Sequence, residues 1–267
     1  MIKSKKKKIF LTFYLYKKEK AMKLELITTR NNNKLYKSED SLVKIFNPEY
    51  SKQDVFHEAS ITSKVEALGL NVPAIKEVYT VDGCWAFNLD LINGKCMTDL
   101  MNEEPENSDK YLKMFVDIQT LIHTKRCDSI TTLRNQLYER INASDLEDYK
   151  KYDLLAVLDS APKHKKLCHG NLNPTHIWID GDTAYVLDWN HATQGNASAD
   201  VARTYLWFSL YKPELADTYI NLFCEKTNTT KRYVRQWLPI VAAARLVKNL
   251  PDEAELLHEW ISQCDYQ

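Results

Sequence analysis

The sequence predicts an α+β fold in which a small antiparallel sheet comes first and a larger, mainly helical part follows. Between residues 23 and 91, apolar and polar residues alternate in short runs, as they do in half-buried strands. Beyond residue 97, apolar residues mostly recur at helical spacing. With 44% apolar and 27% charged residues, the 267-residue chain has the composition of a globular protein, long enough for one large core or two lobes.

The first part is expected to contain five strands and one helix. Ser51 can cap the helix, and Gly69 and Pro73 end it. Asp82 and Gly83 form a dipeptide that tight hairpin turns prefer, because both residue types tolerate positive φ. The expected strands are residues 24–29, 34–38, 41–46, 75–81 and 84–91.

Residues 92–94, Ile-Asn-Gly, are the expected hinge between the two parts. We therefore expect a lobe at 22–91 and a helical lobe at 92–267. Two short strands are expected at 177–180 and 184–187, around a Gly-Asp turn. The expected helices are residues 97–101, 108–125, 131–142, 145–159, 197–210, 214–225, 230–248 and 252–264.

Residues 1–21 form a basic extension with eight lysines and one acidic residue, and we expect it to be unstructured. Its apolar run, residues 9–16, is short for a signal peptide, lacks a small-residue cleavage site and is below the roughly 20 residues of a membrane span. We expect translation to start at Met22 and no membrane association.

Charge and cysteine usage favour a cytoplasmic protein that does not bind nucleic acid. The net charge is zero, and the chain after the extension carries seven more acidic than basic residues, so no basic surface is expected. The six cysteines are scattered, with no Cys-x-x-Cys pair, which is typical of reduced thiols rather than of a disulfide framework.

One segment carries most of the functional signal. It begins at Leu167 and reads LCHGNLNPTHIWIDGDTAYVLDWNHATQGNASADVA. It resembles the catalytic segment of the aminoglycoside phosphotransferase and choline kinase family, a branch of the protein-kinase-like fold. The family pattern is His-Gly-Asp, four residues, Asn, a hairpin and a hydrophobic-Asp-Trp step. The chain keeps His169, Gly170 and Asp188. This resemblance implies a bilobal fold and ATP-dependent phosphoryl transfer.

The resemblance also implies a nucleotide site. Lys44 lies in an alternating strand, at the position of the family lysine that contacts the α and β phosphates of ATP. Glu58 matches the helix glutamate that holds this lysine, and Asp188 matches the aspartate that binds magnesium, or manganese. The residues alone also fit a solvent-facing lysine, an ordinary helix carboxylate and a turn aspartate. The expected phosphate loop, residues 30–33, reads Arg-Asn-Asn-Asn and has no glycine.

Two positions of the catalytic segment depart from the family. Asn171 replaces the catalytic Asp, and an amide can orient a hydroxyl but does not take its proton. His176 replaces a metal-holding Asn, and imidazole suits zinc, copper or iron better than magnesium. His176 can pack, replace the lost base or hold another metal. We expect packing first and impaired catalysis overall.

Other residues near the segment have a structural and a functional interpretation. We expect His169 and Asp200 to support the loop, while Asn173, Asn190 and His191 either line a cleft or pack. The aromatic C-terminal helices are more often core than a cage for a quaternary ammonium. The carboxylates at positions 252, 253, 255 and 259 fit a solvated helix face better than an aminoglycoside site.

Three functions follow from these observations. The first is an ATP-dependent transfer of the γ-phosphate to the hydroxyl of a small molecule, with impaired catalysis. The second is a pseudokinase-like module that binds a nucleotide or metabolite without turnover. The third is transfer of another group, such as a nucleotidyl group.

Overall fold

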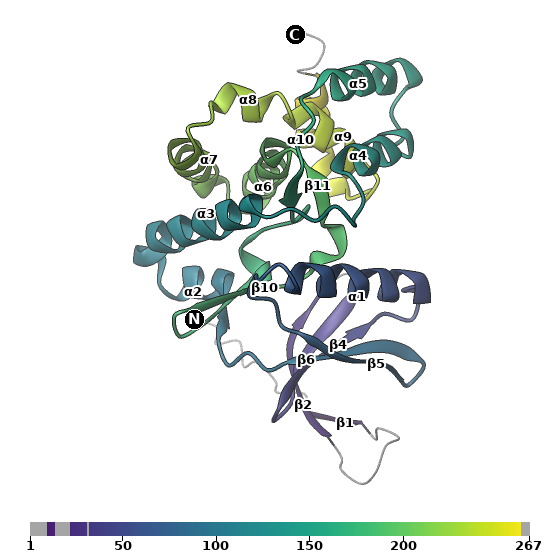
Figure 1. Ribbon diagram of the computed structural model, residues 1–267, viewed down its shortest axis with the longest axis vertical. Helices are drawn as coiled ribbons and strands as arrows, with labels where there is room; N and C mark the ends of the chain where they lie inside the picture. The colour runs from purple at the N-terminus through teal and green to yellow at the C-terminus, as the bar shows by residue number, and fades with distance from the viewer. Residues whose placement is uncertain (1–9, 14–21, 31, 263–267) are drawn as a thin grey trace. The chain divides into compact units, whose positions relative to one another are not determined.

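The computed structural model describes residues 10–13, 22–30 and 32–262 (Figure 1). The chain divides into two compact units: unit 1 contains Met1–Lys95 and Trp178–Asn190, and unit 2 contains Cys96–Ile177 and His191–Gln267. Unit 1 is built on an antiparallel sheet, whereas unit 2 is mainly helical. The predicted α+β fold, with a sheet lobe and a helical lobe, is therefore confirmed.

The sheet of unit 1 has six strands in the order β1-β2-β3-β4-β6-β5, and every neighbouring pair is antiparallel. Apolar residues of β4, β6 and the helix α1, including Leu42, Phe46, Val55 and Phe87, are almost completely buried. The elements are β1 (Phe10–Phe13), β2 (Met22–Thr29), β3 (Asn33–Lys37), β4 (Ser41–Phe46), α1 (Lys52–Glu66), β5 (Ile75–Val81) and β6 (Cys84–Asp90).

Two local signals of unit 1 act as the sequence predicts. The Ser51 side chain accepts a hydrogen bond from the amide of Asp54 and caps α1, which satisfies one of the amides that a helix start leaves unpaired. In the hairpin between β5 and β6, Asp82 has φ of 49° and Gly83 has φ of 80°. Positive φ at both central residues matches the right-handed twist of the two strands.

Part of the N-terminal extension forms a strand that the sequence analysis does not expect. Phe10–Phe13 form β1 and pair with β2, with Phe10 opposite Glu25 and Phe13 opposite Met22. The run Phe-Leu-Thr-Phe is rich in residues that favour strands, and β2 offers it an unpaired edge. The rest of the extension, residues 1–9 and 14–21, lies outside the described residues.

Unit 2 is held together by buried aromatic side chains. The ring of Phe115 lies edge-on to Phe208 and Tyr219, with centroids 5.6 and 5.7 Å apart, and Phe208 stacks on Tyr219 at 5.0 Å. These aromatic residues are core. The helices are α2 (Met97–Glu103), α3 (Ser108–Thr124), α4 (Leu133–Asn142), α5 (Asp148–Ser160), α6 (Ala197–Tyr211), α7 (Pro213–Thr227), α8 (Lys231–Arg235), α9 (Leu238–Leu246) and α10 (Pro251–Ser262), with short 3-10 turns η1 (Pro105–Asn107) and η2 (Pro174–His176).

The helix predicted at 230–248 is two helices, α8 and α9. Pro239 lies in the first turn of α9, where its missing amide hydrogen costs nothing, but it cannot continue a helix that began earlier. Further short strands were not expected: β8 (Lys166–Cys168) pairs antiparallel with β11 (Thr193–Gly195), and β7 (Lys95–Cys96) pairs with the predicted strand β9 (Ile177–Asp180). The partner of β9 in its hairpin is β10 (Thr183–Val186).

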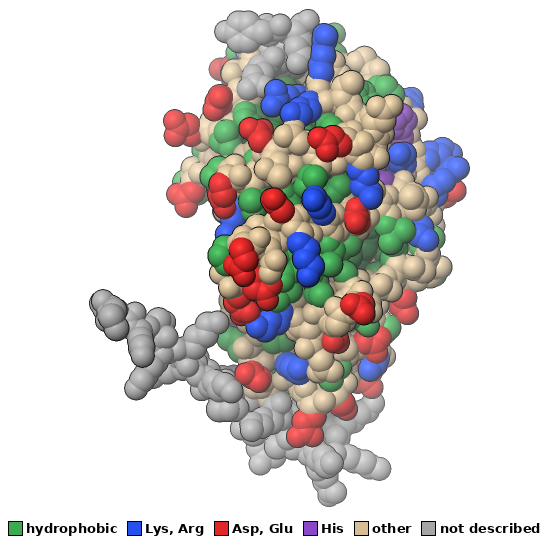
Figure 2. Space-filling model, turned by 90° about the vertical axis from the view of Figure 1, so that its left-hand side faces the viewer, with side chains coloured by type: hydrophobic (Ala, Val, Ile, Leu, Met, Phe, Trp, Pro, Cys, Tyr) green, Lys and Arg blue, Asp and Glu red, His purple; other side chains and the backbone are tan. Residues whose placement is uncertain are grey.

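The surface and the cysteines give two general observations. Acidic and basic side chains are intermixed on the face that Figure 2 shows. Cys84, Cys96, Cys127, Cys168 and Cys224 are free thiols, and the sixth cysteine lies outside the described residues. Among the helices that the structure describes, none combines the length and the apolar character needed to cross a membrane.

Candidate functional site

Lys44 is a buried lysine at the centre of a network of charges in unit 1. It lies on β4, and only 5% of the residue is exposed. Its Nζ donates a hydrogen bond to Oε1 of Glu58, on α1, and another to Oδ1 of Asp188 at 2.6 Å. Burial lowers the pKa of Lys44, and the charge of Arg30 lowers it further, while Glu58 opposes both effects. Thus one ammonium joins two carboxylates from different elements.

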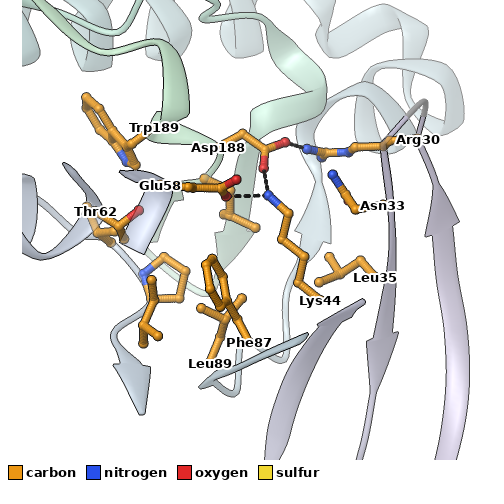
Figure 3. Close-up of a pocket in the computed structure, with 14 residues that line it drawn as sticks. Arg30, Asn33, Leu35, Lys44, Glu58, Thr62, Phe87, Leu89, Asp188 and Trp189 are labelled. Atoms are coloured by element: carbon orange, nitrogen blue, oxygen red, sulfur yellow. Dashed lines mark hydrogen bonds and ion pairs between the residues drawn. The ribbon is translucent and has the colours of Figure 1, made fainter. Parts of the chain in front are cut away.

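Arg30 brings a second cation to the same carboxylate. Its Nη1 forms an ion pair with Oδ2 of Asp188, so the two oxygens of Asp188 face two different cations (Figure 3). Asp188 follows β10 and has φ of 64°, a conformation that is uncommon for residues other than glycine. The chain therefore holds Asp188 in an unusual backbone conformation where its carboxylate meets Lys44 and Arg30.

The charged groups border a pocket with apolar walls. Glu58 is 4% exposed, and its Oε2 is buried without a hydrogen-bond partner among the described residues. A buried carboxylate oxygen of this kind accepts a donor at little cost. The apolar lining comes from Leu35, Val72, Pro73, Ile75, Phe87, Leu89 and Leu187. The pocket thus combines an apolar surface with two cations.

An apolar surface beside two cations is the type of lining that a nucleotide base and its phosphates require. A carboxylate oxygen such as Oδ1 or Oδ2 of Asp188 is also the donor that magnesium or manganese prefers. Because each oxygen is paired with a cation, a metal ion at Asp188 would compete with Arg30 and Lys44 for the carboxylate.

The loop that begins at His169 lies in unit 2 and is fixed by Asp200. Asp200 accepts hydrogen bonds from the amides of His169 (3.2 Å) and Gly170 (2.7 Å), and its Oδ2 is 2.9 Å from Nε2 of His123. Burial raises the pKa of Asp200, but the hydrogen bond and charge of His123, the charge of His169 and the Gly170 amide together lower it. An ionised carboxylate is therefore the anchor of this loop.

Asn171 and His176 contact one another through the backbone. Nδ1 of His176 lies 2.9 Å from the carbonyl oxygen of Asn171 and 3.2 Å from Nδ2 of Asn173. The His176 ring is 6% exposed and stacks on His169, with centroids 5.8 Å apart. The Asn171 amide hydrogen is donated to Nδ1 of His169 at 3.3 Å. His176 thus packs into its own loop through one nitrogen and one face.

The remaining residues near the segment have different positions. Asn173 is buried, donates to the carbonyl of Asn171 at 3.0 Å and accepts from the amide of Thr175 at 3.0 Å, so it shapes the loop. Asn190 belongs to unit 1, where its side chain forms a hydrogen bond with Tyr50. His191 belongs to unit 2, and Nδ1 of its ring accepts from Arg140, at 3.2 Å.

The carboxylates of α10 do not form one group. Asp252, Glu255 and Glu259 are exposed, as the sequence analysis favours. Glu253 instead is 3% exposed and accepts two hydrogen bonds from Arg245, at 2.7 Å from Nε and 2.6 Å from Nη2. Glu253 is buried because this bidentate ion pair compensates its charge.

Sequence reasoning missed two groups of basic residues. Arg30 was noticed only as part of a loop without glycine, although a lone arginine there could have suggested a phosphate or carboxylate contact. In unit 2, Arg140, Arg203, Arg245 and Lys248 affect one another electrostatically. The signal in the sequence was Arg203, which interrupts the apolar and small residues of α6.

Comparisons with known proteins agree with the fold. Aminoglycoside phosphotransferase APH(4)-Ia is 14% identical with a TM-score of 0.66, covering 91% of this chain and 92% of the other. Choline kinase LicA from Streptococcus pneumoniae is 13% identical with a TM-score of 0.60, covering 90% and 92%. A choline/ethanolamine kinase family protein from Mesorhizobium loti is 11% identical with a TM-score of 0.57, covering 91% and 87%. At these identities the likeness shows the fold.

A thermostable mutant of APH(4)-Ia, 14% identical with a TM-score of 0.65 over 91% of this chain and 92% of the other, was solved as a ternary complex with AMP-PNP and hygromycin B. No curated protein sequence matches this chain significantly. Residues 27–238 match the phosphotransferase enzyme family, a span of more than half of the sequence. The resemblance seen in the catalytic segment is thereby confirmed, and the chain belongs to the phosphotransferase enzyme family.

Proposed function

We propose that this chain is an ATP-dependent small-molecule phosphotransferase that transfers the γ-phosphate to a hydroxyl group, with slow turnover. The main support is the position of Lys44, buried between Glu58 and Asp188 at the edge of an apolar pocket. Burying a charged lysine costs free energy unless its ammonium group is paired or binds a ligand. Binding of a nucleotide phosphate is a use that agrees with the family.

In this proposal each of the four charged residues at the pocket of unit 1 has one role. Lys44 binds the α and β phosphates, and Glu58 holds its ammonium in place. Asp188 provides the carboxylate for magnesium, or manganese, which when bound neutralises phosphate charge. Arg30 leaves Asp188 for a phosphate oxygen when the nucleotide enters, because the more highly charged triphosphate is the stronger partner.

Slow turnover follows from Asn171 and His176. The Asn171 side chain can orient an acceptor hydroxyl but cannot take its proton, and a general base typically contributes about a hundred- to ten-thousand-fold. His176 has Nδ1 directed at the Asn171 carbonyl, and imidazole is a poor ligand for magnesium. Phosphoryl transfer depends mostly on positioning and charge neutralisation, so a residual rate is expected.

The test measures ATP consumption with a panel of small hydroxyl compounds, for the native chain and for Asn171→Asp. We expect slow product formation by the native chain and a rise toward the general-base contribution of about a hundred-fold or more in the variant. Asn135→Asp, at an exposed asparagine of α4, adds the same charge elsewhere in unit 2 and should change nothing. The melting temperatures of the three proteins are also measured with and without ATP. If ATP raises none of them, the proposal is refuted.

A pseudokinase-like module that binds a nucleotide or metabolite without turnover is the second candidate. Its support is that both departures from the family fall in one six-residue loop, while Lys44, Glu58 and Asp188 persist. A thermal shift with ATP and manganese, combined with no turnover in native chain and Asn171→Asp, would favour it. Mass spectrometry of the products separates phosphorylation from nucleotidyl transfer.

The five free thiols among the described residues support our proposal that the protein is cytoplasmic.

A further inference from the structure

Four basic side chains of unit 2 come from elements that pack on one helix. Arg140 lies on α4, Arg203 on α6 and Arg245 on α9, and Lys248 follows α9. Both α4 and α6 pack against α9. The four side chains lie close enough for each to perturb another, and we call them the basic cluster.

Arg203 is the member whose environment is least compensated. Its Nε and Nη2 are buried and have no hydrogen-bond partner among the described residues. Burial lowers the pKa of Arg203 well below its usual value, and the neighbouring Arg140 and Arg245 lower it further. Arg203 as a residue is partly exposed, but two buried donors without a hydrogen-bond partner cost free energy.

The acidic groups near the cluster already have partners. Glu253 accepts from Arg245 and from the hydroxyl of Tyr211. Asp200 accepts from two backbone amides and is bonded to His123. Glu139, the other carboxylate that acts on Arg140, is exposed.

Among the described residues, the ring of His191 is the side-chain hydrogen-bond partner of Arg140. Nη2 of Arg140 is 3.2 Å from Nδ1 of His191. Burial lowers the pKa of His191 well below its usual value, as do the charges of Arg203, Arg140, Lys248 and His169. His191 therefore adds no negative charge. Among the described residues around the cluster, the basic side chains therefore outnumber the acidic side chains that are not already paired.

The geometry of the unpaired donors identifies the chemistry they suit. Nε and Nη2 lie on one side of a guanidinium and point in parallel, which matches the two oxygens of a carboxylate or phosphate. Arg245 uses the same two atoms to hold Glu253, at 2.7 and 2.6 Å. Arg203 presents this fork without a carboxylate from the described chain.

We propose that the basic cluster binds an oxyanion, the carboxylate or phosphate group of a small molecule, with Arg203 as its bidentate partner. Lys248 is the exposed member of the basic cluster, and the three arginines are each partly exposed. Desolvation and the guanidinium groups of Arg245, Arg203 and Arg140 lower its pKa to about 7, and a bound anion would reverse this effect.

If the proposed phosphotransferase function holds, this anion is part of the acceptor, because His191, which accepts from Arg140, lies against Gly170 in the loop that contains Asn171. The acceptor is then an anionic hydroxy compound, such as a hydroxy acid or a sugar phosphate, rather than a polycation or a quaternary ammonium. Cationic acceptors would be repelled by Arg140, Arg203 and Lys248. Anion binding itself does not depend on ATP, so the two ideas can fail separately.

Calorimetric titration of the full chain with sodium malate and with inorganic phosphate, at constant ionic strength in chloride, tests the proposal. We expect saturable binding of at least one probe and a tenfold or greater loss in Arg203→Met. Arg203→Lys keeps the charge without the fork and should recover only part. Arg134→Met is the matched control, because Arg134 on α4 is paired with Asp159 at 2.9 Å, and it should bind as the native chain does.

Two further variants keep the result interpretable. Lys248→Met should weaken binding even if Arg203→Met does not fold. Lys44→Met removes a cation from the pocket of unit 1, and binding should survive it. Binding that is lost in Lys44→Met but kept in Arg203→Met and Lys248→Met would overturn the proposal, as would no binding of either probe by the native chain. Preferential stabilisation by choline or kanamycin would contradict the anionic acceptor.

Discussion

Replacing Lys44 by methionine tests whether the buried charge network is organised as described. Methionine has similar length and no charge, so the change removes the ammonium while filling most of its volume. Glu58 then loses the partner of Oε1, and its Oε2 has none among the described residues. Asp188 keeps Arg30 on its other oxygen. The unpaired group in Lys44→Met is therefore Glu58.

The expected cost follows from the burial of this carboxylate. The side chains of Lys44 and Glu58 are 7% and 5% exposed, so solvent compensates little of the lost charge. Breaking a buried ion pair by removing one partner typically costs about 3 to 5 kcal/mol, whereas replacing both partners by apolar residues is often close to neutral. We expect Lys44→Met to lose about 3 kcal/mol and Lys44→Met/Glu58→Met to lie within about 1 kcal/mol of the native chain.

Urea unfolding, followed by circular dichroism and by tryptophan fluorescence, measures these differences. Coincident transitions are needed before free energies are compared, because the chain has two units. A loss below about 1 kcal/mol in Lys44→Met would refute the buried pair. A double variant as unstable as the single one would refute the role of Glu58 as the unpaired group.

Three other predictions use different parts of the structure. Arg30→Gln removes one cation from Asp188, so Mn²⁺ without nucleotide should bind roughly five-fold more tightly by electron paramagnetic resonance, the equivalent of about 1 kcal/mol; weaker binding would contradict the pairing. Gly170→Ala places a Cβ 2.1 Å from a carbonyl oxygen and should lower the melting temperature far more than Gly69→Ala, which has a similar φ and open space. Asp200 has a lowered pKa, so its stabilising contribution is complete at pH 7 and is lost as the pH falls below about 4; Asp200→Asn should be less stable at pH 7 and less acid-sensitive in unfolding experiments, and equal acid sensitivity would count against the anchor.

Local chemistry predicted the parts of the fold that one or two residues decide. The hairpin at Asp82 and Gly83 requires positive φ twice, and few other dipeptides allow it. The start of α1 needs an oxygen acceptor, which Ser51 provides. The break before α9 was missed because apolar spacing continues across Pro239, and the effect of proline depends on where the helix begins. β1 was missed because its pairing depends on an available edge of β2.

The candidate site was predicted unevenly for a similar reason. The contact of Lys44 with Glu58 was expected from the family resemblance, whereas its direct contact with Asp188 was not, and the nucleotide-binding role of these residues stays a prediction. The pairing of Arg30 with Asp188 could not be predicted, because the two residues are 158 positions apart in the sequence and only the fold brings them together. Arg203 was missed because hydrophobic periodicity does not show which polar atoms are buried, whereas the structure shows that its Nε and Nη2 are buried without a hydrogen-bond partner among the described residues.

The basic residues of unit 1 and the basic cluster of unit 2 are expected to bind different ligands, because their pairing without a ligand differs. In unit 1, Lys44 and Arg30 face Asp188, so each cation has a carboxylate to return to when no ligand is bound. In unit 2, Arg203 has no such carboxylate among the described residues, so an incoming anion displaces none from its fork. A ligand that must displace a carboxylate from a cation binds more weakly, because the lost ion pair offsets part of the new one. A cation without such a partner keeps the whole interaction energy with the ligand. We therefore expect the anion site to respond to simple oxyanions and the pocket of unit 1 to require a multiply charged ligand such as a nucleotide triphosphate.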